Sequence, residues 1–404
     1  MKAVALSDGI YGLHANVQNN DLFEGIWPIP DGVSLNSYIL KGDKVAMIDL
    51  FRDWDGAKGK VEAQLTDLGL SFRDIDYLII NHMEPDHTGW LAEFKKINPS
   101  VEILTTKKAA VLVKAFYHFD DGIRVVATGD TLSLGGGKEL LFVETPNVHW
   151  PETMVTYEKQ SKTLFSCDAF GSFGKVADGK EFDDLLTAAE HEFFEGETDR
   201  YYADIISSFS AFVLKALDAV KSLDIGTIAP SHGIIWRKDI ARVIERYRRL
   251  ASYFNTPAEK RITVVWASMY GNTEKMLPSI LEGIRIEGVP VSIHRIPEEH
   301  VSYVLSSAWK SRGLVLGMPT YEYKMFPPMA YVLDILERSH VAYKKVLRFG
   351  SFGWSGGAQK EFDTFMERLK WECLPPVEWQ GLPQEDDLKR GFEAGKALAR
   401  AVAL

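Results

Sequence analysis

The stretch that decides the fold is Asn81-His82-Met83-Glu84-Pro85-Asp86-His87, which carries two imidazoles and two carboxylates within six residues. It directly follows Asp76-Tyr77-Leu78-Ile79-Ile80, an apolar run typical of a buried strand. Imidazole nitrogens together with carboxylate oxygens suit iron, zinc or manganese. The alternative is a solvated polar turn, which one histidine and one acid would fit. Four such groups at these spacings fit a turn poorly, so we predict a metal site.

Three more ligand-type residues stand where strand-like runs end. His149 comes just after the run 140–144, Asp168 ends the run 164–168, and His232 ends the run 228–232. A single histidine beside an apolar run is more often a hydrogen-bonded core or loop residue. The joint pattern favours a site, because ends of several strands can converge on one cleft. The remaining histidines lack this context and are expected at the surface or in the core: His14, His118, His191, His294, His300 and His340.

The second half of the chain contains a different pattern. The strand-like run 262–267 ends in Ser268-Met269-Tyr270-Gly271-Asn272-Thr273, and a helical pattern follows through Ile284. Backbone N–H groups and a helix N-terminus favour an anion there, and the Ser268 and Thr273 hydroxyls can donate to it. The loop matches neither the G-x-x-x-x-G-K-[ST] nor the G-x-G-x-x-G pattern, and an ordinary helix cap is the alternative.

Further strand-like runs alternate with helical segments downstream, at 291–296, 313–318 and 345–349. This rhythm predicts a doubly wound parallel sheet with ligands at the carboxyl ends of its strands. The last two runs lead into Pro319-Thr320-Tyr321-Glu322-Tyr323 and Ser351-Phe352-Gly353-Trp354-Ser355-Gly356-Gly357-Ala358. One aromatic from each loop could sandwich a planar ring, while the glycines let backbone N–H groups approach its edge. The alternative for these aromatics is loop-to-core anchoring.

Both patterns resemble known families. The first resembles the metallo-β-lactamase motif H-x-H-x-D-H followed by His, Asp and His, with Glu84 in place of the second histidine. That version, H-x-E-x-D-H, resembles the flavodiiron proteins, whose metal site is a non-haem diiron centre. The extra carboxylate adds negative charge and hard oxygen donation, which favours iron over a zinc-type ligand set. The second pattern resembles flavodoxin, which implies FMN as the ligand.

The resemblance assigns each of these residues to an iron or to the flavin. One iron would be bound by His82, Glu84 and His149, the other by Asp86, His87 and His232, and Asp168 would bridge the two. The flavin would be bound by three loops, with these residues: Ser268, Met269, Tyr270, Gly271, Asn272, Thr273, Pro319, Thr320, Tyr321, Ser351, Phe352, Gly353, Trp354, Ser355, Gly356 and Gly357.

Composition narrows the class of protein. The 404 residues carry a net charge of -10 and no block of Lys and Arg, so a nucleic-acid partner is not expected. No apolar stretch is long enough to span a membrane, and the first residues turn polar too soon for a secretory signal. Cys167 and Cys373 form no C-x-x-C pair, so neither an iron–sulfur cluster nor a rubredoxin module is expected in this chain. A cytoplasmic location follows as an expectation.

The expected architecture is α/β with two domains. A metallo-β-lactamase-like αββα sandwich is expected over residues 1–254, a linker over 255–261, and a flavodoxin-like FMN domain over 262–404. The linker is placed where a helical segment ends and a short polar stretch with one proline begins. Further helical patterns lie near 61–70 and from 200 to 223.

The flavodiiron resemblance implies an oxidoreductase. It would reduce dioxygen to water, nitric oxide to nitrous oxide, or both, with FMN returning electrons to the irons. Family members are head-to-tail homodimers, so a homodimer or a dimer of dimers is expected, with rubredoxin or reduced deazaflavin as a separate electron donor. Two alternatives remain: a zinc hydrolase fused to a flavodoxin, which Glu84 disfavours, and an electron carrier with an inert metal domain, which the intact ligand set disfavours. The preferred gas and the donor stay open.

Overall fold

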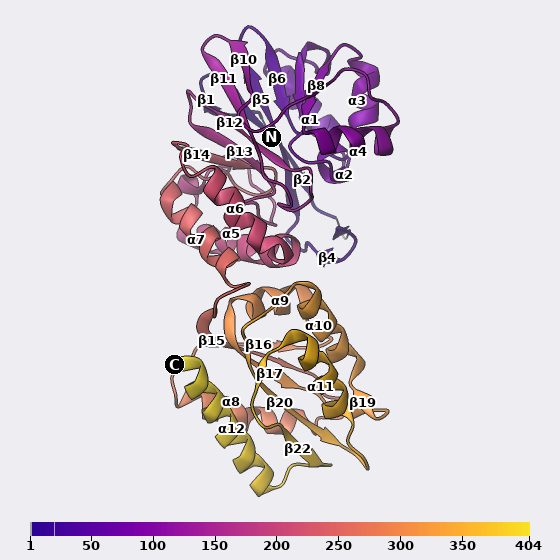
Figure 1. Cartoon of the computed structure of the whole chain (residues 1–404), viewed down its shortest axis with the longest axis vertical. Helices are drawn as coiled ribbons and strands as arrows, with labels where there is room; N and C mark the ends of the chain where they lie inside the picture. Colours follow the sequence, from indigo (N-terminus) through magenta and orange to yellow (C-terminus); the bar gives the residue numbers. More distant parts are fainter. Residues whose placement is uncertain (1, 20) are drawn as a thin grey trace. The chain divides into compact units, whose positions relative to one another are not determined.

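The computed structural model describes residues 2–19 and 21–404 (Figure 1). The chain divides into two compact units, residues 1–249 and 250–404. The expected linker 255–261 differs in detail, because strand β15 (Glu259–Trp266) begins inside it. Within the described residues, no helix has both the length and the apolar character to cross a membrane.

The first unit contains two sheets. Strands of the seven-stranded sheet, in spatial order, are β1 (Val4–Ser7), β2 (Ile10–Val17), β5 (Val33–Lys41), β6 (Val45–Ile48), β7 (Tyr77–Ile79), β8 (Glu102–Thr105) and β9 (Ile123–Val125). Strands of the five-stranded sheet are β10 (Thr131–Gly135), β11 (Lys138–Glu144), β12 (Met154–Glu158), β13 (Thr163–Cys167) and β14 (Thr227–Pro230). A small hairpin joins β3 (Leu22–Phe23) to β4 (Trp27–Pro28).

The core of this unit lies between the two sheets. Tyr38 and Ile48 from the first sheet belong to the same buried cluster as Phe142 and Phe165 from the second. The rings of Tyr38 and Phe165 have their centroids 5.0 Å apart. Because apolar side chains of both sheets fill one layer, the sheets must pack face to face. Helices cover this pair, so the predicted αββα sandwich is confirmed (Figure 1).

The first unit contains helices that the sequence predicted, near 61–70 and within 200–223 among them, and others that it did not predict. They are α1 (Ala57–Asp67), α2 (Pro85–Thr88), α3 (Leu91–Ile97), α4 (Lys107–Tyr117), α5 (Ala188–Tyr201), α6 (Ser210–Ala219) and α7 (Ile240–Ser252). The helical pattern expected from 200 to 223 is present as far as Ala219, but it is not one regular α-helix. A π-helical stretch over 202–206 and a 3₁₀ turn over 207–209 separate α5 from α6. Burial of the apolar side chains of this stretch, Ile205 and Ile206 among them, outweighs regular helix periodicity.

The second unit is a parallel sheet with helices on both faces (Figure 1). Its strands are β16 (Val291–Arg295), β15, β17 (Ser311–Gly317), β20 (Lys345–Phe352), β21 (Glu372–Cys373) and β22 (Val377–Gln380), and a hairpin joins β18 (Thr320–Tyr321) to β19 (Lys324–Met325). The strand order has the flavodoxin-like 2-1-3-4-5 form, so the predicted doubly wound sheet is confirmed. Its helices are α8 (Leu277–Arg285), α9 (Val301–Lys310), α10 (Pro327–Arg338), α11 (Ala358–Leu369) and α12 (Glu385–Ala403).

Helices α8 and α12 approach each other closely because glycines line their contact. A Cβ on Gly395 would lie 2.3 Å from the Ile280 carbonyl oxygen, and a Cβ on Gly283 would lie 2.1 Å from the Phe392 carbonyl oxygen. Both obstacles are backbone atoms, which cannot rotate away. The small residues therefore set the distance between the two helices.

We expect Gly395→Ala to destabilise the second unit, since the added methyl group forces α12 away from α8. Overpacking of this kind costs about 1–3 kcal/mol, or roughly 2–4 °C in Tm for each kcal/mol. Gly196→Ala in α5 is the matched control, because a Cβ there meets nothing within 4 Å. That control should raise Tm slightly through helix propensity. Thermal unfolding checks both, and an increase in Tm for Gly395→Ala would contradict the packing argument.

Candidate metal centre and cofactor pocket

The predicted metal ligands come from different strand ends and meet at one edge of the sandwich. The segment His82–His87 follows β7 and runs into α2. Asp168 follows the last residue of β13, and His232 comes two residues after β14 ends. His149 lies in the connection between β11 and β12. Short buried strands thus position all the ligand-type side chains that follow them.

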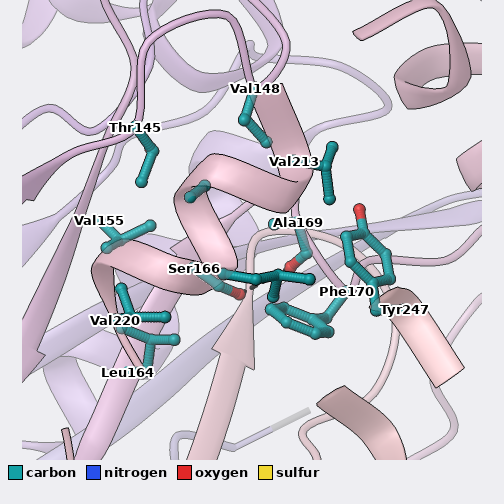
Figure 2. A pocket seen from close by; sticks show the side chains of 12 residues that line it. Thr145, Val148, Val155, Leu164, Ser166, Ala169, Phe170, Val213, Val220 and Tyr247 are labelled. Carbon is teal, nitrogen blue, oxygen red and sulfur yellow. Dashed lines mark hydrogen bonds between the residues drawn. The ribbon is translucent and has the colours of Figure 1, made fainter. Parts of the chain in front are cut away.

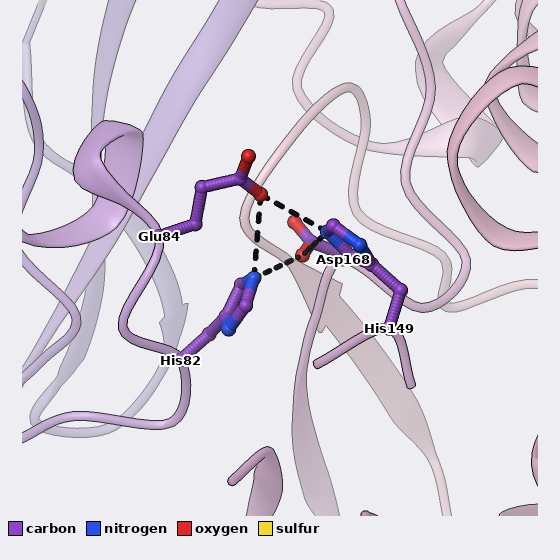
Figure 3. Close-up of side chains that lie close together, drawn as sticks. All are labelled: His82, Glu84, His149 and Asp168. Atoms are coloured by element: carbon purple, nitrogen blue, oxygen red, sulfur yellow. Dashed lines mark hydrogen bonds and ion pairs between the residues drawn. The ribbon is translucent and has the colours of Figure 1, made fainter. Parts of the chain in front are cut away.

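Four of these residues form a first group. One ligand atom each from His82, Glu84, His149 and Asp168 lie within 4.8 Å of one another (Figure 3). Glu84 Oε2 lies 3.0 Å from His149 Nε2 and 3.3 Å from His82 Nε2. Asp168 Oδ2 lies 3.5 Å and 3.4 Å from the same two nitrogens. Donor atoms that point at a common centre, as these do, can hold a metal ion.

A second group adjoins the first. Ligand atoms of Asp86, His87 and His232 also lie within 4.8 Å of one another. Asp86 Oδ2 lies 3.1 Å from His232 Nε2, and its Oδ1 lies 3.4 Å from His87 Nε2. The other oxygen of Asp168, Oδ1, lies 3.0 Å from His87 Nε2 and 3.4 Å from His232 Nε2. The two oxygens of Asp168 therefore face two different pairs of imidazoles, the position that a bridging carboxylate takes.

The polar atoms of the two groups suit cations. Among the described residues, both carboxylate oxygens of Asp86, the Nε2 atoms of His87 and His232, and Oδ2 of Asp168 are buried without a hydrogen bond of ordinary geometry. Buried polar atoms left in this state cost free energy. Metal ions would satisfy them, so these residues fit a pair of metal ions.

Histidines and carboxylates of the two metal groups shift one another's pKa values toward their charged forms. Burial lowers the pKa of His149, but its close contacts with the carboxylates of Asp168 and Glu84 outweigh burial and raise that pKa to about 10. Burial likewise lowers the pKa of His232, and Asp168 and Asp86 raise it to about 9. Burial alone would raise the pKa of Asp168, yet the charge of His87 and the close contact with His149 hold it well below its usual range. The site therefore keeps its acids ionised and attracts positive charge.

Outer contacts fix the imidazoles, and the sequence analysis missed them. His82 Nδ1 lies 2.8 Å from Glu152 Oε1, and both side chains are fully buried. Glu152 also accepts the Met83 backbone N–H at 3.0 Å. His232 Nδ1 lies 2.8 Å from the carbonyl oxygen of Ser34. A histidine that donates from Nδ1 presents Nε2 to a cation. The only sequence feature that points to Glu152 is its place three residues after His149, and no periodic pattern marks it.

We expect Glu152→Ala to lower metal affinity at the first group by about 10–100-fold, as is typical when a ligating histidine loses its outer partner. Glu152→Gln retains an acceptor for His82 Nδ1 and should lose less. Metal titration of each apo variant checks this order. Equal loss in both variants would show that the charge of Glu152, and not the orientation of His82, matters.

A separate pocket gives access to the metal groups. It has a volume of about 180 Å³, and Glu84 and Asp86 are among the residues that line it. Phe23, Arg52 and Trp54 form parts of its wall. A small substrate can therefore reach the two groups from solvent.

The second unit has a larger cavity, of about 400 Å³, beyond the ends of β15, β17 and β20. Its lining comes from the three predicted loops: Ser268, Met269, Tyr270, Asn272, Thr273, Pro319, Thr320, Tyr321, Ser351, Phe352, Gly353 and Trp354, joined by Glu322 and Gly381. Four predicted residues are not in the lining: Gly271, Ser355, Gly356 and Gly357. Cavities of this size at the carboxyl ends of parallel strands bind nucleotide-like ligands.

The side chains around this cavity favour a ligand over simple anchoring. Trp354 is 75% exposed and Tyr270 is 92% exposed, so neither ring is anchored in the core. Thr273 is buried, and its hydroxyl lies 3.0 Å from the Ser351 hydroxyl. Gly357 serves the backbone instead, because a Cβ there would lie 2.1 Å from the Tyr323 carbonyl oxygen. Flat rings and hydroxyls around an open cavity suit a planar, phosphate-bearing ligand.

Known proteins resemble the chain over its whole length. A family described as "ODP family beta lactamase" matches residues 33–233. The nitric oxide reductase of Moorella thermoacetica is 33% identical over 408 residues, which cover 99% of this chain and 99% of that protein. The structure of rubredoxin oxygen:oxidoreductase from Desulfovibrio gigas has a TM-score of 0.92 and 26% identity, covering 100% of this chain and 99% of that one.

A mutant of the flavo di-iron protein from Thermotoga maritima has a TM-score of 0.88 and 28% identity, covering 99% of each chain. Similarity therefore extends through both units and includes the order of the metal-binding and flavodoxin-like parts. The chain belongs to the flavodiiron protein family, a family of oxidoreductases with FMN and a diiron centre as cofactors.

Proposed function

We propose that this protein reduces nitric oxide or dioxygen at a diiron centre that receives its electrons through FMN. The observation that carries the proposal is the carboxylate of Asp168, whose two oxygens face separate pairs of imidazoles. When bound, a pair of ferrous ions supplies electrons to the gas, and the products are nitrous oxide and water from nitric oxide, or water from dioxygen. The names of the relatives support both gases, because one is a nitric oxide reductase and another an oxygen oxidoreductase.

The proposed ligands are those that the resemblance to the flavodiiron proteins implies. His82, Glu84 and His149 hold one iron, and Asp86, His87 and His232 hold the other, with Asp168 between them. The interatomic distances support this division, since each set of three surrounds its own centre. The negative charge of Asp168 offsets the repulsion between two cations at close range. Glu84 and Asp86, which reach the access pocket, stand where the gas enters.

For FMN we propose that the loop Ser268–Thr273 holds the phosphate and that the two later loops hold the ring. Ser268 and Thr273 offer hydroxyls beside the start of the following helical turn. The rings of Tyr321 and Trp354 flank the isoalloxazine, and Gly353 allows a backbone N–H to reach its edge. The cavity volume and the exposed state of Trp354 support this arrangement.

We expect Thr273→Ala to weaken FMN binding by about 1–3 kcal/mol, the cost of losing a charge-assisted hydrogen bond. The mutation also removes the partner of the Ser351 hydroxyl inside the cavity. Flavin fluorescence titration of the apo-protein measures the effect. Thr364→Ala on the exposed face of α11 is the control and should bind FMN as the unmodified chain does. Unchanged affinity in Thr273→Ala would refute the phosphate assignment.

The electron donor and the assembly belong to the same proposal. A separate protein or reduced cofactor delivers the electrons, rubredoxin or reduced deazaflavin. The name of the Desulfovibrio relative supports the first of these. We further propose a cytoplasmic homodimer or dimer of dimers, in which a metal-binding domain and an FMN domain are joined by a short segment that ends where β15 begins.

Anaerobic stopped-flow mixing tests the function. Iron-loaded, FMN-bound protein is reduced and then mixed with nitric oxide or dioxygen, and flavin oxidation is followed together with loss of the gas. We expect rapid oxidation by at least one gas and two irons per chain by elemental analysis. Protein that binds zinc stoichiometrically, and that reduces neither gas after reconstitution with iron, would instead support the hydrolase alternative.

A further inference from the structure

A small apolar pocket lies near the metal groups, apart from the access pocket. It is formed by strands β12 and β13, helix α6, and Tyr247 of α7 (Figure 2). Two lining residues are chain neighbours of proposed ligands, since Val148 precedes His149 and Ala169 follows Asp168. The pocket therefore lies on the other side of the backbone that carries these ligands.

The wall of this pocket is almost entirely apolar. Val155, Leu164, Val213 and Leu217 are all buried there. The pocket leaves about 30 Å³ for the centre of a water-sized sphere, and one water needs about 10–15 Å³ on that measure. There is room for a small diatomic molecule, and no room for a substrate of ordinary size.

The Tyr247 side chain lines this space, and its hydroxyl has at most a weak contact with the backbone of Phe170. Tyr247 is 3% exposed, and its hydroxyl makes no hydrogen bond of ordinary geometry to any described residue. Ser166, also in the wall, already donates its hydroxyl to the Ala169 carbonyl at 2.7 Å. A buried water needs two to four polar partners, so a single hydroxyl does not hold one well. A guest that is mostly apolar and accepts one weak hydrogen bond matches this wall better.

We propose that this pocket is a storage site for the gas substrate, where one molecule of nitric oxide or dioxygen waits beside the metal centre. The inference rests on the proposed function for the identity of the guest. The binding itself follows from the pocket, because dry apolar cavities take up small apolar gases such as xenon. Storage there raises the amount of gas close to His149 and Asp168 when the gas in solution is scarce.

The first test is xenon pressurisation of crystals of the iron-loaded full-length protein. We expect one xenon atom among Val213, Leu217 and Tyr247. Val213→Ile extends one wall residue into the space, and its xenon occupancy should fall about tenfold through overpacking. Ala216→Val is a second variant on the same helix, and its xenon occupancy should also fall. Val113→Ile, in the buried face of α4, is the matched control and should keep full occupancy.

The second test measures flavin oxidation at low and at saturating gas. Val213→Ile should be slower only at low gas, while Val113→Ile should match the unmodified protein at both. The xenon result does not depend on turnover, so it stands or falls separately from the proposed function. An empty pocket under xenon, or an ordered water that xenon does not displace, would overturn the proposal. If Val213→Ile loses xenon binding but oxidises its flavin at the unmodified rate at low gas, the storage role is wrong.

Discussion

Asp168→Ala should leave the protein without a working metal centre while its flavin remains bound. Each oxygen of Asp168 lies 3.0–3.5 Å from two imidazole nitrogens, so its removal takes one ligand from each metal position. It also removes the negative charge between two cations. The loss in iron affinity should exceed the ~10–100-fold typical of an outer-shell partner, because a direct ligand is lost. Iron content and gas reduction measure it.

FMN retention controls for folding in this experiment, since the cofactor cavity belongs to the other unit. Asp168→Asn is the graded variant, because it keeps the shape and one oxygen of the side chain but not its charge. We expect it to retain more iron than Asp168→Ala. Parallel loss of iron and FMN would indicate general unfolding, and normal iron content in Asp168→Ala would exclude this residue as a ligand.

Two defective chains should restore activity when they are combined in one dimer. The first carries His87→Ala, which removes a metal ligand and leaves the flavin. The second carries Thr273→Ala with Trp354→Ala, which removes flavin contacts and leaves the metal centre. Each site is built within its own unit, so each defect stays local. If electrons cross between subunits of a symmetric dimer, one complete flavin–metal pair exists per mixed dimer.

Activity of the mixed dimer should reach at most about half that of the unmodified dimer, since one of two equivalent pairs is intact. Separate affinity tags isolate the mixed species, and gas consumption is compared with that of both parent homodimers, which should be inactive. His118→Ala in the first chain is a control variant, because that histidine lies outside both metal groups. Inactive mixed dimers that hold one FMN and one pair of irons would place electron transfer within one chain.

Much of the fold followed from periodicity. Runs such as 313–318 and 345–349 alternate with helical segments, and they became the parallel strands β17 and β20. The helical pattern from 200 to 223 was right as far as Ala219, but it did not reveal the π-helical and 3₁₀ stretches between α5 and α6, whose side chains are mostly buried. The start of β15 at Glu259 was missed because strand pairing with β17 extends into a polar stretch.

The ligand-type residues were found because each ends a strand, and strand ends can converge. Contacts between segments that are distant in the sequence are not marked by a position at a strand end, so the sequence did not predict them. Glu152 supports His82 across 70 residues of sequence, and Ser34 supports His232 across 198. The sequence did not separate glycines that line the cofactor cavity from glycines that allow close backbone packing. Gly353 lines the cavity, whereas Gly357 lies against the backbone of Tyr323. Such distinctions depend on tertiary packing, which composition and spacing do not contain.

The central claim is that Asp168 joins two iron sites into one centre. Mössbauer spectroscopy of the ⁵⁷Fe-loaded, oxidised protein tests it most directly, because a shared ligand couples the spins of two ferric ions. The account predicts two irons per chain in a single coupled, diamagnetic pair, and loss of that signal in Asp168→Ala. Two magnetically independent ferric ions, or the same coupled spectrum in Asp168→Ala, would contradict it.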